Sequence, residues 1–299
     1  MKQAAREQLA QFLTHLRDRN LSPHTVAAYR RDLDALVDWC DRQAVDDWAA
    51  FDHGAARSYI AQRHRRGAAP RSLRRSLAAI RTFYGWLNSQ RLVRHNPAHE
   101  MPMPKLPRHL PVTLDADQMA QLLEAAPDNP TAVRDYAIME LLYSSGLRLA
   151  ELVALDLDAL ADDNTVRVTG KGSKERVVPV GSRARAALVQ WRKLRHEWAA
   201  ADEPALFVSR RGTRLTPRTV QNRVKQWARR QGAAANVHPH LLRHSCASHV
   251  LESSGDLRAV QELLGHANLS TTQIYTHLDF QHLARIYDEA HPRAKKKGR

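Results

Sequence analysis

Five prolines lie close together between positions 96 and 111, and they constrain the fold more than any other feature of this sequence. They are Pro97, Pro102, Pro104, Pro107 and Pro111. Each proline removes a backbone hydrogen-bond donor and disfavours helix in the residue before it. Residues 96–111 are therefore expected to form an extended linker between two domains of the 299-residue chain.

The part before the linker, residues 1–95, has the apolar spacing of amphipathic helices. Ser22 and Pro23 form a helix start, because a serine oxygen caps free backbone amides and proline fits the first helical turn. Apolar residues then recur three and four positions apart, and they do so again over 73–87. With further helices near 7–19 and 53–66, this part is predicted to be a domain of about four helices.

The part after the linker, residues 112–291, is also predicted to be mostly helical. Helices are expected near 117–125, 132–145 and 217–231, with a candidate short strand at 205–208. Over 164–180 the apolar period changes to two, around the stretch Gly170-Lys171-Gly172-Ser173-Lys174. This pattern predicts a β-hairpin with a lysine-bearing tip. The fold class is therefore mainly α with a small β-hairpin, followed by a basic tail at 292–299.

The charge of the chain points to an acidic polymer as its partner. The formal net charge is +15 and the sequence pI is near 10.4, and each phosphate bound by a cation releases a counterion. No apolar run approaches the length of about 18 residues of a spanning helix, and the N-terminus lacks the apolar core of a signal peptide. No membrane insertion and a cytoplasmic location are therefore expected.

The first domain contains a run of positive charge without any acidic residue. Residues 53–94 contain ten arginines and no Asp or Glu. The alternative is a solvated helix face, but solvated faces usually mix both signs. Nucleic-acid contact is therefore predicted here, in particular by Arg71, Arg74, Arg75 and Arg81.

Two arginines of the second domain are candidates for binding a phosphodiester. Arg148 follows Gly146 and opens an apolar helical run, where a lone cation is unusual, although it could be an ordinary surface arginine. His240 and Arg243 are three residues apart, which places them on one face of a helix. Beside a phosphate-bound arginine, an imidazole can accept or deliver a proton near neutral pH. His240 could instead cap the helix or pack against its neighbours. The same structural role is expected of His244, His249 and His277.

Tyr275 is the candidate nucleophile. It follows Ser270-Thr271-Thr272-Gln273, which has the pattern of a helix-capping box. A phenol with a pKa of about 10 needs cationic or basic neighbours to attack, and Arg148, Arg243, His240 and His266 would supply them. At the hairpin tip, Lys171 could donate a proton to a leaving 5′ oxygen, with Lys174 as a competitor. Both lysines could instead only contact phosphates.

Metal-dependent chemistry is disfavoured by the residues present. No close cluster of carboxylates suits metal ions, and the histidines near position 240 have no Cys or carboxylate to complete a zinc site. Cys40 and Cys246 are too few for a disulfide framework. Arginine, permanently charged and able to grip two oxygens, is the natural substitute. No metal and no cofactor are therefore expected.

Four ordered motifs in the second domain resemble the tyrosine recombinases, the phage integrase family, and the resemblance extends over nearly the whole chain. The motifs are Gly-Leu-Arg-Leu-Ala-Glu-Leu, Gly-Lys-Gly-Ser-Lys-Glu-Arg, His-Pro-His-Leu-Leu-Arg-His and Leu-Leu-Gly-His-Ala-Asn-Leu-Ser-Thr-Thr-Gln-Ile-Tyr-Thr-His. Within the family the chain is most similar to the bacterial Xer type. Its ending, residues 276–295, is closer to the branch that acts with an XerD-type recombinase.

The resemblance implies a catalytic set of Arg148, Lys171, His240, Arg243, His266 and Tyr275. It implies a SAM-like, core-binding domain at 1–95 and a catalytic domain at 112–291, which form a C-shaped clamp on double-stranded DNA. It further implies cutting and rejoining of DNA through a 3′-phosphotyrosyl intermediate and a Holliday junction, without a metal. The implied partners are an XerD-type recombinase in a heterotetramer, a dif-type site and an FtsK-type translocase, acting to resolve chromosome dimers at cell division.

Three other classes of protein compete with this interpretation. A type IB topoisomerase would use similar chemistry to relax supercoils alone. A non-enzymatic DNA-binding protein could share the charge and the helices. A metal-dependent nuclease would lose its activity in EDTA.

Overall fold

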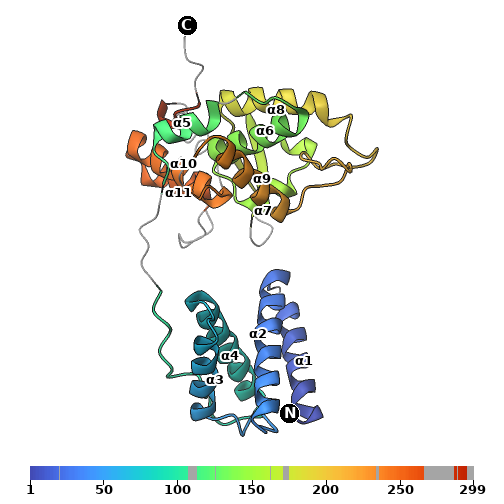
Figure 1. Cartoon of the computed structure of the whole chain (residues 1–299), viewed down its shortest axis with the longest axis vertical. Helices are drawn as coiled ribbons and strands as arrows, with labels where there is room; N and C mark the ends of the chain where they lie inside the picture. The colour runs from blue at the N-terminus through green and yellow to red at the C-terminus, as the bar shows by residue number, and fades with distance from the viewer. Residues whose placement is uncertain are drawn as a thin grey trace. The chain divides into compact units, whose positions relative to one another are not determined.

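The computed structural model describes residues 1–19, 21–106, 113–124, 126–161, 163–170, 175–233, 236–265, 286–287 and 289–294. The chain divides into two compact units, Met1–His109 and Leu110–Arg299, and each has its own hydrophobic core. Both units are mainly helical in their described parts, and unit 2 contains a small two-stranded sheet, as the sequence predicts (Figure 1).

Unit 1 consists of four helices in its described part: α1 (Gln3–Asp18), α2 (Pro23–Arg42), α3 (His53–Arg65) and α4 (Pro70–Ser89). The predicted start of α2 is confirmed, because the Ser22 hydroxyl accepts a hydrogen bond from the Thr25 backbone N–H at 3.2 Å. Aromatic side chains fill the core between the helices. The rings of Trp48 and Phe83, for example, meet edge to face with their centroids 4.8 Å apart.

The first residues of the expected linker belong to unit 1 and pack against its helices. Ala98 and Met101 are buried in its core. Arg81 of α4 holds this stretch, because its guanidinium group donates to the Ala98 carbonyl at 2.8 Å and to the Met101 carbonyl. Residues 107–112 lie outside the described residues.

Unit 2 is arranged around α6. Its described helices are α5 (Ala116–Glu124), α6 (Pro130–Ser145), α7 (Leu149–Ala154), the 3-10 turn η1 (Leu157–Ala159), α8 (Ser182–Arg195), α9 (Pro217–Arg230), α10 (Pro239–Ser254) and α11 (Leu257–Leu264). Helix α6 is buried on nearly all sides and packs against α8 and α10. It ends at Gly146, as predicted, because the φ of +57° there is a left-handed conformation that favours glycine.

The predicted hairpin is confirmed as strands β1 (Thr165–Thr169) and β2 (Glu175–Pro179), which pair antiparallel. Val166 pairs with Val178 and Val168 pairs with Arg176. The strand predicted at 205–208 is wrong, because this segment makes only isolated bridges, from Ala205 to Asp156 and from Val208 to Arg214. Its buried residues bond to several different neighbours instead of one continuous partner.

The described end of the chain packs on α6. The Tyr287 hydroxyl lies 2.6 Å from the Ser144 hydroxyl. Arg293 forms an ion pair with the buried carboxylate of Glu140. The predicted basic tail at 292–299 therefore begins with residues held against the body of unit 2, while residues 295–299 lie outside the described part of the chain.

Candidate active site

Arg148 stands at the junction of α6 and α7. It is the N-cap of α7, and its backbone N–H donates to Glu151 Oε2 at 2.8 Å while its Nη1 donates to Oε1 at 2.7 Å. Its Nη2 donates to the Gly265 carbonyl at 3.1 Å. The Arg148 side chain remains 43% exposed, so its position is fixed while part of the guanidinium group stays accessible.

Arg243 approaches the same place from α10 and is buried. Its guanidinium group donates to the Gly146 carbonyl and, at 2.7 Å, to the Leu264 carbonyl. Burial, and then the positive charge of Arg148, lower the pKa of Arg243 to about 10. The group is therefore still a cation at neutral pH, and it lines the same cavity as the exposed Arg148.

Glu151 joins the arginines, and the sequence analysis missed it. Its buried carboxylate accepts two hydrogen bonds from Arg176, at 2.8 and 2.9 Å, besides those from Arg148. Burial alone would raise the pKa of Glu151, but hydrogen bonds from Arg176 and from the Arg148 backbone lower it to about 2. With Arg243 4.0 Å away, three cations surround one anion, so the cluster has a net formal charge of +2 (three minus one).

Three of the predicted catalytic residues meet in one cavity. A cavity of about 540 Å³ is lined by Arg148, His240 and Arg243, among others. His240 lies exposed in the first turn of α10. The predicted three-residue spacing therefore does bring His240 and Arg243 to the same cavity, one exposed and one buried.

The neighbouring histidines have structural roles. His238 caps α10, because its Nδ1 accepts from the Leu241 backbone N–H at 3.1 Å. Burial, then the charges of His240 and Lys225, lower the pKa of His238, which favours the neutral ring that can accept this bond. The capping role that was an alternative for His240 thus belongs to His238. His249 bonds to the Tyr143 hydroxyl at 2.8 Å, as expected of a packed histidine.

Helix α9 contributes lining residues that sequence reasoning did not select. Gln221 and Lys225, four residues apart, line the cavity, as do His238 and Asn236. The opposite face of α9 is buried through Val220, Val224, Trp227 and Ala228. The signal was present in the sequence as a sharply amphipathic helix whose polar face is basic, but the pattern did not say which neighbour that face meets.

Four predicted site residues, Lys171, Lys174, His266 and Tyr275, lie outside the described residues. Two described positions border them. Gly170, which follows strand β1, immediately precedes Lys171. Gly265, whose carbonyl accepts a hydrogen bond from Arg148, immediately precedes His266.

The four arginines predicted to contact DNA in unit 1 differ in their surroundings. Arg71 and Arg74 are exposed at the start of α4. Arg75 forms a two-point ion pair with the buried Asp32, and Arg81 bonds to backbone carbonyls. Their contact with DNA stays a prediction, and the structure gives two of them a role within unit 1 as well.

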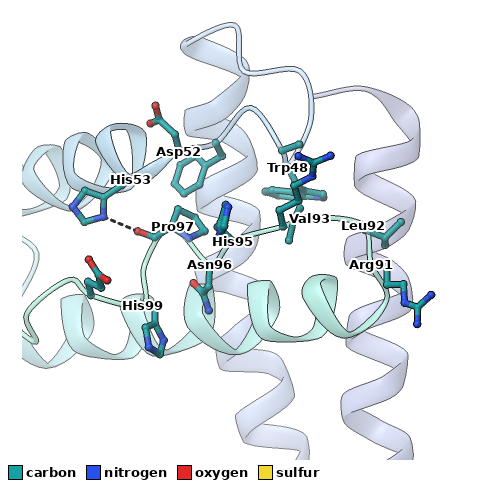
Figure 2. Close-up of a pocket in the computed structure, with 14 residues that line it drawn as sticks. Trp48, Asp52, His53, Arg91, Leu92, Val93, His95, Asn96, Pro97 and His99 are labelled. Carbon is teal, nitrogen blue, oxygen red and sulfur yellow. Dashed lines mark hydrogen bonds between the residues drawn. The ribbon is translucent and has the colours of Figure 1, made fainter.

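A second cavity, of about 910 Å³, lies in unit 1 and contains none of the predicted site residues (Figure 2). Trp48, Phe51 and Val93 line it together with His53, His95 and His99. His53 Nδ1 lies 3.0 Å from the Pro97 carbonyl.

Across the described residues of both units, no group of three or more His, Cys, Asp or Glu side chains is arranged to hold a metal ion. None of the described helices combines the length and apolarity that a membrane crossing requires.

Comparison with known proteins identifies the family of the chain. Residues 112–282 match the phage integrase family, and residues 9–91 match its N-terminal SAM-like domain. The tyrosine recombinase XerC of Pseudomonas fluorescens is 56% identical over 292 residues, which is 97% of each chain.

Solved structures show the same fold. The XerH site-specific recombinase bound to a palindromic difH substrate matches with a TM-score of 0.70 at 21% identity, over 90% of this chain and 81% of that one. XerA recombinase matches at 28% identity with a TM-score of 0.50, over 94% and 97% of the two chains. The chain therefore belongs to the phage integrase family and is a site-specific DNA recombinase of the tyrosine type.

Proposed function

We propose that the cavity lined by Arg148, His240 and Arg243 holds the scissile phosphate of a DNA strand, which the Tyr275 hydroxyl attacks. The new bond joins the phenolic oxygen to phosphorus as a 3′-phosphotyrosyl ester. The bond to the 5′ oxygen breaks, and that oxygen leaves as a hydroxyl. The convergence of two fixed guanidinium groups and one imidazole on a single cavity supports this proposal.

The arginines suit the charge that develops during attack. Five-coordinate phosphorus places extra negative charge on its equatorial oxygens, which fixed cationic donors stabilise. A guanidinium group has five N–H donors. Among the described residues, Arg148 uses two of them and Arg243 uses two, so each retains three for phosphate oxygens. Because both groups are held by protein acceptors, they need little reorganisation when the phosphate arrives.

The proton transfers fall to the remaining predicted residues. His240, exposed on the cavity, can take the phenolic proton or exchange it with a phosphate oxygen, with His266 as its partner. Lys171 donates a proton to the leaving 5′ oxygen, and Lys174 contacts a phosphate. The 5′ hydroxyl of a second duplex then reverses the step. Since the phosphotyrosyl ester conserves the bond energy, rejoining requires no ATP and no metal ion.

We further propose that this chemistry serves chromosome segregation. Two sequential strand exchanges through a Holliday junction would resolve chromosome dimers at cell division, in the cytoplasm. The chain would act at a dif-type site in a heterotetramer with an XerD-type recombinase, activated by an FtsK-type translocase, with both domains closed around the DNA as a C-shaped clamp. The similarity to XerC proteins and to a recombinase bound to a difH substrate supports this setting.

A suicide substrate tests the chemistry directly. A candidate dif-type duplex, nicked beside the scissile phosphate, loses the short 5′-hydroxyl fragment after attack and traps the covalent complex. Mass spectrometry should place the DNA on Tyr275, in EDTA as well as in magnesium, and Tyr275→Phe should bind the site without forming the adduct. An adduct on another residue would contradict the proposal, as would cleavage abolished by EDTA. Relaxation of plasmids without a defined site would instead indicate a topoisomerase.

A further inference from the structure

Arg176 contacts Glu151, which in turn binds Arg148 of the proposed active site. The sequence analysis gave Arg176 no role. Arg176 lies on β2, paired with Val168 of β1. Its side chain is only 8% exposed, and its two terminal nitrogens donate to the two oxygens of the Glu151 carboxylate, at 2.8 and 2.9 Å.

These contacts saturate the Glu151 carboxylate. A carboxylate offers about four lone-pair directions, two on each oxygen. Oε1 accepts from Arg148 Nη1 and Arg176 Nη1, and Oε2 accepts from the Arg148 backbone N–H and Arg176 Nη2. Each carboxylate oxygen is therefore shared by Arg148 and Arg176, so Arg176 helps to fix Arg148 through the common anion.

Arg176 also touches Gly265, the residue before His266. A Cβ atom at Gly265 would lie 2.9 Å from Arg176 Nε, and the φ of Gly265 is +61°, so both space and backbone favour glycine. The Gly265 carbonyl accepts from Arg148. Arg176 and Arg148 thus both lie against Gly265, the residue before His266 in the sequence.

One N–H donor of the Arg176 guanidinium group makes no hydrogen bond within the described fold. Its Nε is buried and has no hydrogen-bond partner among the described residues. Buried donors are nearly always paired, so an unpaired one calls for an explanation beyond packing. This donor lies beside Gly265, where the segment carrying the predicted nucleophile begins.

We propose that Arg176 is a positioning residue for DNA cleavage. It orients Arg148 through Glu151 and supports Gly265 ahead of His266, without contacting the phosphate itself. This inference rests on the proposed phosphotyrosyl chemistry.

Arg176→Lys tests the inference, because lysine retains the charge but cannot make the two-point contact. Single-turnover cleavage of the nicked substrate is measured with enzyme in excess, at saturating concentration. The rate constant for adduct formation should fall about 10–100-fold, the loss typical of a small misplacement of a binding group. The dissociation constant for the site should change less than about threefold, because phosphate contacts elsewhere dominate affinity. Arg192→Lys, on the exposed face of α8, is the matched control and should react like the wild type.

Two further measurements separate positioning from a purely structural role. A methylphosphonate at the scissile position removes the charge that Arg148 compensates, so the defect of Arg176→Lys should shrink on this substrate. Glu151→Gln acts through the same contact, so the double variant should be little slower than the slower single variant. The reaction amplitude reports the folded fraction, and the rate constant then applies to folded molecules only.

Three results would overturn the inference while wild-type protein still forms the adduct. The first is a rate constant of adduct formation for Arg176→Lys within about threefold of wild type. The second is an equal fold loss of rate on the charged and the methylphosphonate substrates. The third is a double variant whose fold loss equals the product of the two single losses. If wild-type protein forms no adduct on any dif-type duplex, the proposed function fails instead.

Discussion

Arg75 Nε and Nη2 donate to the buried carboxylate of Asp32 at 2.6 and 3.2 Å, which ties α4 to α2. Arg71 and Arg74 precede it on the same helix and are exposed. The three arginines, all predicted to contact DNA, should therefore respond differently to substitution.

Replacing Arg71 and Arg74 by glutamine should weaken DNA binding and leave stability nearly unchanged. Each lost phosphate contact should reduce the slope of log affinity against log salt by about 0.9. Arg75→Gln should in addition lower the free energy of unfolding by about 1–3 kcal/mol, because it leaves a buried carboxylate without its main partner. Salt-dependent binding titrations and urea unfolding measure the two effects. An unchanged salt slope for the double variant would remove both residues from the DNA interface.

Protonation of Glu151 at acidic pH should lower the free energy of unfolding of unit 2. Its pKa is about 2 in the folded chain against an ordinary value of 4.5, so below pH 4.5 the unfolded state binds more protons. The stability from the ionised carboxylate is complete above pH 4.5 and is lost as the pH falls toward 2. Glu151→Gln should be less stable than wild type by about 1–3 kcal/mol at pH 7, and this difference should diminish in urea titrations between pH 5 and 3. A difference that does not change with pH would show that the pairing with Arg176 and Arg148 is not the cause.

His238 and His240, two residues apart, should separate stability from catalysis. His238→Ala removes the cap of α10 and should lower the free energy of unfolding by about 1 kcal/mol, while His238→Asn, which can cap, should retain most of it. His240→Asn should leave unfolding unchanged and slow adduct formation about a hundredfold or more, since general acid–base groups contribute rates of that order. If His240→Asn cleaved at the wild-type rate, His240 would have to be removed from the catalytic set.

Local signals in the sequence predicted much of this fold. Ser22 before Pro23, and Gly146 after an apolar run, mark helix ends through backbone chemistry that acts within a few residues. The same locality explains the hairpin around 170–174. The strand predicted at 205–208 was wrong because its burial depends on distant parts of the chain. Its apolar residues are buried by several separate neighbours and not by a strand beside them.

The residues of the candidate site could be selected from the sequence only where they carry their own signal. Arg148 and the pair His240 and Arg243 stood out by type and spacing, and the structure brings them to one cavity. Glu151 and Arg176 are 25 residues apart and belong to a helix and a strand. Nothing in either local pattern says that the hairpin packs against α7, so their pairing required the tertiary structure. That His238, and not His240, caps α10 also depended on which ring accepts from the Leu241 backbone N–H.

His291 should make the attachment of the chain end sensitive to pH. It is buried between the rings of Tyr143 and Tyr287, with its Nε2 3.3 Å from the Tyr143 carbonyl and its Nδ1 accepting from the Arg293 backbone N–H at 3.1 Å. Only a neutral ring makes both bonds, because one nitrogen donates and the other accepts. Burial accordingly lowers the pKa of His291 to about 3.

Because an unfolded imidazole takes up its proton near pH 6.5, the unfolded state binds more protons than the folded state between pH 6.5 and 3. The free energy of unfolding should therefore fall as the pH drops below 6.5, with the contribution of His291 complete only above that value. His291→Gln, whose amide can both donate and accept but does not titrate, should flatten this part of the profile. Hydrogen exchange of the Arg293 amide should accelerate between pH 6.5 and 5, after correction for intrinsic rates, in wild type and not in the variant. Equal profiles for the two proteins would show that another group controls the attachment.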